Sequence, residues 1–232
     1  MSRADRLHRA GVAAATAGDL VDAERLLREA LDSASADGDL ALQARAEATL
    51  AYIAADRSTI DHALELCQRA LRFGGLDDQT RGMLAGQQAT LLRRAGRIVE
   101  ALTSFSEAIE LLAGSPADLA RAHLNRGTVH LDRQDLVAAV LDFSAAADGH
   151  RAAGDEVSAA QADHNRAYAM FLSGDLVGAL ALMESSYDLQ AAAGPLVKAV
   201  CDADRAEVLM AAGLTRQGGE MLRQAAVSSP AT

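Results

Sequence analysis

Small residues recur along the chain with a period of about 39 residues. The clearest series, called anchors below, is Ala23, Ala63, Ala101, Ala139, Ala179 and Gly218. A larger apolar residue stands four positions after each anchor, where helical spacing puts both side chains on one face. These larger residues are Leu27, Cys67, Phe105, Phe143, Met183 and Leu222. The pattern predicts six repeated helical units.

Three further positions of the unit repeat as well. Small residues stand twelve positions before the anchors and seven after them: Gly11, Ala51, Ala89, Gly127, Ala167, Ala206, and Ala30, Ala70, Ala108, Ala146, Ser186, Ala225. Residues suited to a turn stand five positions before the anchors: Gly18, Ser58, Gly96, Gln134, Gly174 and Gly213. Each unit therefore reads as two closely packed helices joined by a tight turn.

This pattern fixes approximate helix limits. We expect first helices near 4–17, 39–56, 78–95, 117–133, 155–173 and 196–212, each followed by a second helix. Asp19, Asp135 and Asp175 stand where an N-cap of a second helix is needed. The extra length of the period falls between repeats, where Pro116 and Pro195 break helices.

The composition agrees with an all-α fold. Half of the residues are hydrophobic, yet only four Phe and three Tyr are aromatic, so the core consists mainly of Ala and Leu, which are strong helix formers. A single helix pair cannot bury its apolar side, so the pairs must stack on one another. We predict one solenoid domain over residues 1–232, with repeats at about 4–35, 39–73, 78–112, 117–150, 155–192 and 196–227.

The units that begin at Leu124 (LNRGTVHLDRQDLVAAVLDFSAA) and His164 (HNRAYAMFLSGDLVGALALMESS) resemble the tetratricopeptide repeat. The resemblance implies a right-handed α-solenoid whose first helices line a concave groove. The chain departs from the family in its longer period and in lacking an aromatic residue near the start of the first helix. The segment DRAEVLMAAGLTRQ also resembles the amino-terminal repeats of actinobacterial CHAT-domain proteins, although nothing after Ala225 is long enough to hold their peptidase domain.

One groove position carries amides in successive repeats. Two residues before the small residue of the first helix stand Arg9, Thr49, Gln87, Asn125, Asn165 and Asp204. In peptide-binding tetratricopeptide proteins an Asn at this position holds the peptide backbone, and the resemblance gives that role to Asn125 and Asn165. Gln87, at the equivalent position, is a further candidate contact. The alternative is that these amides are solvated or bonded to their own backbone.

Other candidate contacts lie along the same helices. Arg93, Arg94 and Arg121 are expected near the groove, where guanidinium groups bind carboxylates, unless they are simply solvated. His164 and Tyr168 share one stripe with Phe171 and form either an apolar subsite or part of the core. A groove with these arginines favours a peptide of some acidic character.

Charge and motifs exclude several other functions. A net charge of −10 without a basic stripe argues against nucleic acid. No long apolar segment predicts a membrane span, so we expect a cytoplasmic protein. Neither Cys67 nor Cys201 belongs to a metal-ligand or disulfide pattern, and both are expected to be reduced core residues. No catalytic, metal or nucleotide motif occurs, so we expect no enzyme activity, metal or cofactor.

The sequence thus favours a protein interaction module that binds a peptide or protein segment in its groove, as the sensor or recruitment arm of a larger regulatory system. The alternative is a structural scaffold that forms a homo-oligomer through its carboxyl-terminal end, because the last helix has no polar capping helix after it. The identity of the partner, and whether the chain is part of a longer protein, stay open at this point.

Overall fold

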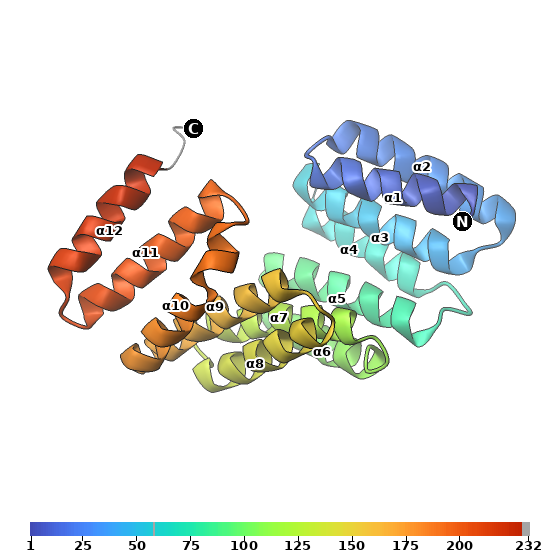
Figure 1. Cartoon of the computed structure of the whole chain (residues 1–232). Helices are drawn as coiled ribbons and strands as arrows, with labels where there is room; N and C mark the ends of the chain where they lie inside the picture. Colours follow the sequence, from blue (N-terminus) through green and yellow to red (C-terminus); the bar gives the residue numbers. More distant parts are fainter. Residues whose placement is uncertain (58, 229–232) are drawn as a thin grey trace. The chain divides into compact units, whose positions relative to one another are not determined.

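The protein is seen in a computed structural model that describes residues 1–57 and 59–228, with side chains for 1–55 and 59–223. These residues form twelve α-helices and, within the described ranges, no strand. The helices run as antiparallel pairs (Figure 1). The expected all-α class is therefore confirmed.

Each repeat consists of a first and a second helix. The first helices are α1 (Arg3–Thr16), α3 (Leu40–Arg57), α5 (Asp78–Arg94), α7 (Pro116–Asp132), α9 (Glu156–Leu172) and α11 (Pro195–Ala211). The second helices are α2 (Leu20–Asp37), α4 (Ile60–Leu71), α6 (Ile98–Leu111), α8 (Leu136–Ala152), α10 (Leu176–Ala191) and α12 (Thr215–Ser228). Every first helix lies within one residue of its predicted limits.

The turns inside the repeats contain the turn residues and N-caps that the sequence predicts. Gly174 has a φ of 96°, and Gln134 takes the same left-handed conformation with a φ of 61°, which side chains other than glycine seldom adopt. Asp19, Asp135 and Asp175 each accept a hydrogen bond from a backbone N–H in the first turn of a second helix, so all three expected N-caps are confirmed. The predicted turn residue Ser58 lies outside the described residues.

Four of the five repeated positions form the core wherever their side chains are described, and the fifth, the turn position, is exposed. All six anchors are buried, as are the small residues of the first helices and the described ones seven positions after the anchors. Gly127 shows why small residues are needed: a Cβ there would lie 2.8 Å from two ring carbons of Phe143. Leu222 is the exception at the larger apolar position, since it is 37% exposed. The side chain of Ala225 lies outside the described residues.

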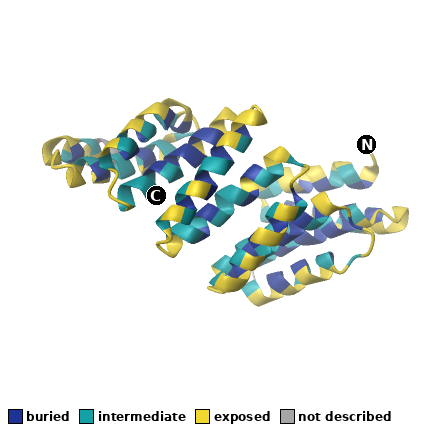
Figure 2. Cartoon of the chain, turned by 90° about the horizontal axis from the view of Figure 1, so that it is seen from below, coloured by how far each residue is buried: buried dark blue, intermediate teal, exposed yellow. Residues whose placement is uncertain are grey.

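The helices pack as two compact units, from Met1 to Ser115 and from Pro116 to the end of the described chain. In the N-terminal unit α1, α3 and α5 lie side by side, with α2, α4 and α6 packed behind them. In the C-terminal unit α7, α9 and α11 lie side by side in the same way, backed by α8, α10 and α12. Buried stripes run along the packed sides of the helices, and exposed residues gather on turns and outer faces (Figure 2).

This arrangement is a tetratricopeptide-like solenoid fold, as the sequence predicted. The single domain over residues 1–232 stays a prediction. No helix in the described part of the chain combines the length and the apolar character needed to cross a membrane.

Candidate peptide-binding face

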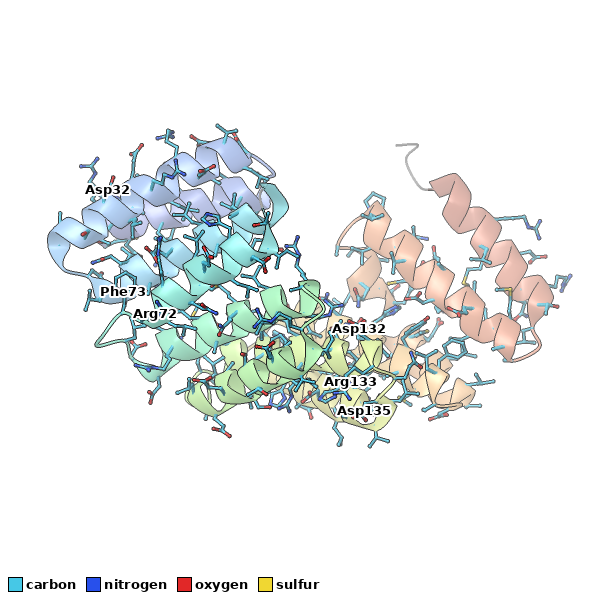
Figure 3. The ribbon with its side chains drawn as sticks, turned by 180° about the vertical axis from the view of Figure 1, so that it is seen from behind. Asp32, Arg72, Phe73, Asp132, Arg133 and Asp135 are labelled. Atoms are coloured by element: carbon cyan, nitrogen blue, oxygen red, sulfur yellow. The ribbon has the colours of Figure 1, made fainter. Side chains whose placement is uncertain are left out.

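Every first helix leaves one stripe of its described side chains unburied, and the stripes of each unit form what we call its first-helix face. The stripe follows helical spacing, with residues 18, 14, 11 and 7 positions before each anchor. In the C-terminal unit it consists of Arg121, Asn125, Thr128 and Asp132 on α7, Gln161, Asn165, Tyr168 and Leu172 on α9, and Val200, Asp204, Glu207 and Ala211 on α11. Asp132 closes the α7 stripe at the turn to α8, next to Arg133 (Figure 3).

Asn125 and Asn165 occupy equivalent places on α7 and α9, which contact each other. Both side chains are half-buried, and neither amide forms a hydrogen bond with any residue that the structure describes. Of the two alternatives drawn from the sequence, a bond to the local backbone is not found for either amide among the described residues, and a solvated amide stays open. Each amide offers a donor and an acceptor toward the first-helix face.

Asp204 occupies the same position on α11 as Asn125 and Asn165 do on their helices, but its carboxylate is bonded within the protein. Its Oδ2 lies 2.8 Å from Nε2 of His164, so α9 and α11 are joined at this point. Burial acts to lower the pKa of His164, but hydrogen bonds with Asp204 and Cys201 outweigh it and raise the pKa to about 9. His164 is buried and protonated at neutral pH. His164 therefore lies beneath the first-helix face and is not exposed on it.

Tyr168 belongs to the first-helix face, but its side chain also contacts other residues of the unit. Its ring meets Phe171 with centroids 5.8 Å apart, and its hydroxyl donates to Oε2 of Glu207 on α11 at 3.3 Å. Burial, then the nearby carboxylates, raise the pKa of Tyr168. Only part of the ring is buried, so its remaining edge is available for contact with a ligand.

The arginines that follow Asn125, Asn165 and Asp204 point away from the face. Arg126 donates from Nε to Oδ2 of Asp142 on α8 at 2.7 Å, and Arg166 donates to the Ser144 hydroxyl at 3.4 Å. Arg205 pairs with Glu184 on α10. These arginines therefore connect first helices to second helices. In each Asn-Arg pair of the sequence, the Asn lies on the first-helix face and the Arg bonds to a neighbouring second helix.

Three buried carboxylates of the C-terminal unit, Asp142, Asp163 and Asp202, were not predicted from the sequence. Asp142 also accepts from Nη2 of Arg126 and lies 2.8 Å from Nδ1 of His123. Burial disfavours ionisation of Asp142, but its hydrogen bonds to Arg126 and His123 outweigh that effect, so its pKa is lowered. Asp163 pairs with Arg151.

Asp202, the third carboxylate, lies on α11. It accepts from the Tyr187 hydroxyl at 2.7 Å and from Lys198 at 2.6 Å. The available signal was position, since Asp163 and Asp202 both stand 16 residues before an anchor, where the second repeat also has a carboxylate, Glu47.

Of the remaining predicted contacts, only Arg121 belongs to the first-helix face of the C-terminal unit. Gln87 is half-buried on α5, in the N-terminal unit, and is not part of the Asn125 and Asn165 pair. Arg93 and Arg94 lie in the last turn of α5, where a cation complements the helix dipole, and Arg94 is 3.5 Å from the Ala55 carbonyl. Arg121 is exposed and pairs with Asp118 at 2.6 Å.

The described residues offer little for metal or nucleophile chemistry. No group of three or more His, Cys, Asp or Glu that could hold a metal ion occurs among them. Both cysteines are free and buried, as expected, and burial raises the pKa of Cys67 to about 12, which keeps this thiol protonated.

Comparison with known proteins identifies the fold. No family model matches the sequence, and no curated protein matches it. Among solved structures, BtubC (BKLC) from P. vanneervenii is similar over 100% of this chain and 96% of its own, with 14% identity and a TM-score of 0.77.

Two other solved structures are also similar. MamA from Desulfovibrio magneticus RS-1 aligns over 82% of this chain and 95% of its own, with 16% identity and a TM-score of 0.61. A signal transduction ATPase with a tetratricopeptide repeat sensor, from Pyrococcus horikoshii, aligns over 97% of this chain but 36% of its own, with 14% identity and a TM-score of 0.72. At these identities the likeness shows the tetratricopeptide-like fold alone.

Proposed function

We propose that the chain is a non-catalytic protein interaction module that holds the backbone of an extended peptide between Asn125 and Asn165 on the first-helix face of its C-terminal unit. The observation that carries the proposal is that two equivalent, half-buried amides on adjacent first helices have no hydrogen-bond partner among the described residues. Amides in such a place pair with the N–H and C=O of a peptide whatever its side chains are.

The character of the ligand follows from the rest of the face. Arg121 is matched by Asp118, while the exposed Glu207 on α11 adds negative charge to the face. A peptide on this face is therefore neutral or basic rather than acidic, which revises the expectation drawn from the arginines. The exposed edge of Tyr168 offers a flat apolar contact for one of its side chains.

We further infer that the module works in the cytoplasm as the sensor or recruitment arm of a larger regulatory system. The resemblance of its sixth repeat to the repeats of CHAT-domain proteins supports this role, as does the sensor named for the similar Pyrococcus horikoshii protein.

The test is a peptide selection followed by affinity measurement. Peptides are selected from a random library on the wild-type protein, and their dissociation constants are compared with the Asn125→Ala, Asn165→Ala variant. We expect affinity to fall about 10- to 100-fold, as for the loss of one or two backbone hydrogen bonds per amide. The control is Thr49→Ala, Gln87→Ala, which changes the equivalent positions of the N-terminal unit and should bind normally.

Equal affinity of the wild type and the double Asn variant, with unchanged helicity, would refute groove recognition by the amides. The same samples test the second candidate, a scaffold that self-associates. This candidate is favoured by Leu222, which is exposed at a position that is buried in the other repeats. A concentration-dependent mass that Leu222→Ser abolishes, without peptide binding, would support it.

A further inference from the structure

The exposed stripe of α11 begins with apolar side chains. Val200, the first residue of this stripe on the first-helix face, is 51% exposed, and Leu196, one helical turn earlier, is 71% exposed. Residues four apart lie on the same side of a helix, so these two side chains are neighbours. Side chains as exposed as these contribute little to the core, so packing inside the chain does not account for them.

The other first helices of the C-terminal unit differ at the same two positions, which lie 22 and 18 residues before the anchor. On α7 these positions hold Ala117 and Arg121, and on α9 they hold Val157 and Gln161. Of the three helices, α11 alone has a large apolar residue at both positions. We call Leu196 and Val200 the apolar pair of α11.

The apolar pair continues the face that carries the two amides. Helix α11 lies beside α9, since Oδ2 of Asp204 is 2.8 Å from Nε2 of His164 and the Tyr168 hydroxyl donates to Glu207 at 3.3 Å. These two contacts join residues that stand 15 and 11 positions before the anchor of α9 to residues 14 and 11 positions before the anchor of α11, so the two helices are aligned in register. Val200 stands one turn before Asp204 on the same stripe, about 6 Å along the helix.

We propose that the apolar pair of α11 is a subsite for one large apolar side chain of the peptide that Asn125 and Asn165 hold. The inference rests on the proposed function and narrows the ligand to a neutral or basic segment with a residue such as leucine or phenylalanine beyond the amide-bound part. Packed helices lie about 8 to 10 Å apart and an extended chain advances about 3.3 Å per residue, so a peptide that crosses α7 and α9 reaches α11 about three residues further on. The amides accept any backbone, and the apolar pair supplies the sequence preference.

The probe is the tightest-binding peptide selected from a random library on the wild type, labelled and synthesised with leucine or glutamine at each position in turn. Fluorescence anisotropy gives its dissociation constants for the wild type and for Leu196→Ser, Val200→Ser. We expect one position at which the wild type prefers leucine about tenfold, and the double variant should reduce that preference to about twofold or less. The matched control is Val177→Ser, which removes a valine that is 81% exposed on the second helix α10 and should keep the preference.

The subsite would be wrong if the wild type preferred leucine at no position, or if Leu196→Ser, Val200→Ser kept the preference with unchanged helicity. Self-association of the wild type that this double variant abolishes would also overturn it, because the apolar pair would then join two copies. In each of these cases a loss of affinity in Asn125→Ala, Asn165→Ala still supports the proposed function. Equal affinity of that Asn variant would instead remove the proposed function, and with it the bound peptide to which the subsite is assigned.

Discussion

The two units share one scaffold and present first-helix faces of opposite charge. In the N-terminal unit the described stripe residues include three arginines and one aspartate: Arg9, Arg45, Arg94 and Asp5. In the C-terminal unit they include one arginine and three carboxylates: Arg121, Asp132, Asp204 and Glu207. Both units have small residues where the first and second helices pack together. The repeat therefore determines how the helices pack, while the charged and polar residues of the first-helix face can differ between units.

The two units also differ in the charged groups that they bury. In the C-terminal unit Asp142, Asp163 and Asp202 are buried between helices and paired with cations or a tyrosine hydroxyl. In the N-terminal unit the corresponding buried carboxylate is Glu47, paired with Arg69 at 3.0 Å. Paired buried charges cost more to separate than apolar contacts, so the units should respond differently to substitution and to pH.

The largest difference is expected from Asp142→Ala. The substitution leaves the Arg126 guanidinium without its carboxylate between α7 and α8, and removal of one partner of a buried pair costs about 3 to 5 kcal/mol. Ser104 on α6 holds the equivalent position of the N-terminal unit, and Ser104→Ala should change stability by less than about 0.5 kcal/mol.

Hydrogen–deuterium exchange followed by peptide measures the two units separately. Protection should fall in α7 and α8 of Asp142→Ala and stay unchanged in α1 to α6. A second variant, Asp142→Ala with Arg126→Met, removes both charges and should recover part of the loss. If Asp142→Ala were as stable as the wild type, the buried ion pair would have no structural role.

A smaller effect is expected from pH, with opposite sign in the two units. The pKa of His164 is about 9 when folded and 6.5 when unfolded, so its stabilisation is complete below pH 6.5 and is lost as pH rises through 9. The difference between these two pKa values corresponds to a loss of about 3 kcal/mol. In the N-terminal unit burial, then Arg45, lower the pKa of His8, so folding of that unit weakens as pH falls below 6.5.

Urea unfolding at several pH values, followed by circular dichroism and by hydrogen–deuterium exchange, measures how the free energy of unfolding of each unit depends on pH. His164→Gln should flatten the alkaline decline, and His8→Gln should flatten the acidic one. Burial also lowers the pKa of His150 in the C-terminal unit, so an acidic slope remains there in His164→Gln. An alkaline decline of the same size in His164→Gln would show that another group causes it.

The sequence was sufficient for the fold because the repeat is redundant. Six copies of one pattern placed the anchors, the turns and the helix limits, and a single ambiguous residue such as Gln134 was settled by its equivalents. Side-chain partners were harder to predict. Asn125 and Arg126 are neighbours in sequence, yet one lies on the open face and the other in a buried ion pair, because helical rotation separates them by about 100°. Pairing between helices, as for His164 and Asp204, has no local signal in the sequence.

The smallest expected effect compares one crossing position in both units. Gly127→Ala adds a Cβ that would lie 2.8 Å from the Phe143 ring, while the matching residue of α5 is already Ala89. Overpacking costs about 1 to 3 kcal/mol, and the better helix propensity of alanine returns about 0.5 to 1 kcal/mol, so we expect a net loss of about 1 kcal/mol. Urea unfolding of Gly127→Ala, Phe143→Leu and the combined variant forms a double-mutant cycle. The smaller leucine makes room for the new Cβ, so the combined variant should be more stable than the sum of the single losses predicts. Strict additivity would mean that the crossing distance of α7 and α8 is not set by this contact.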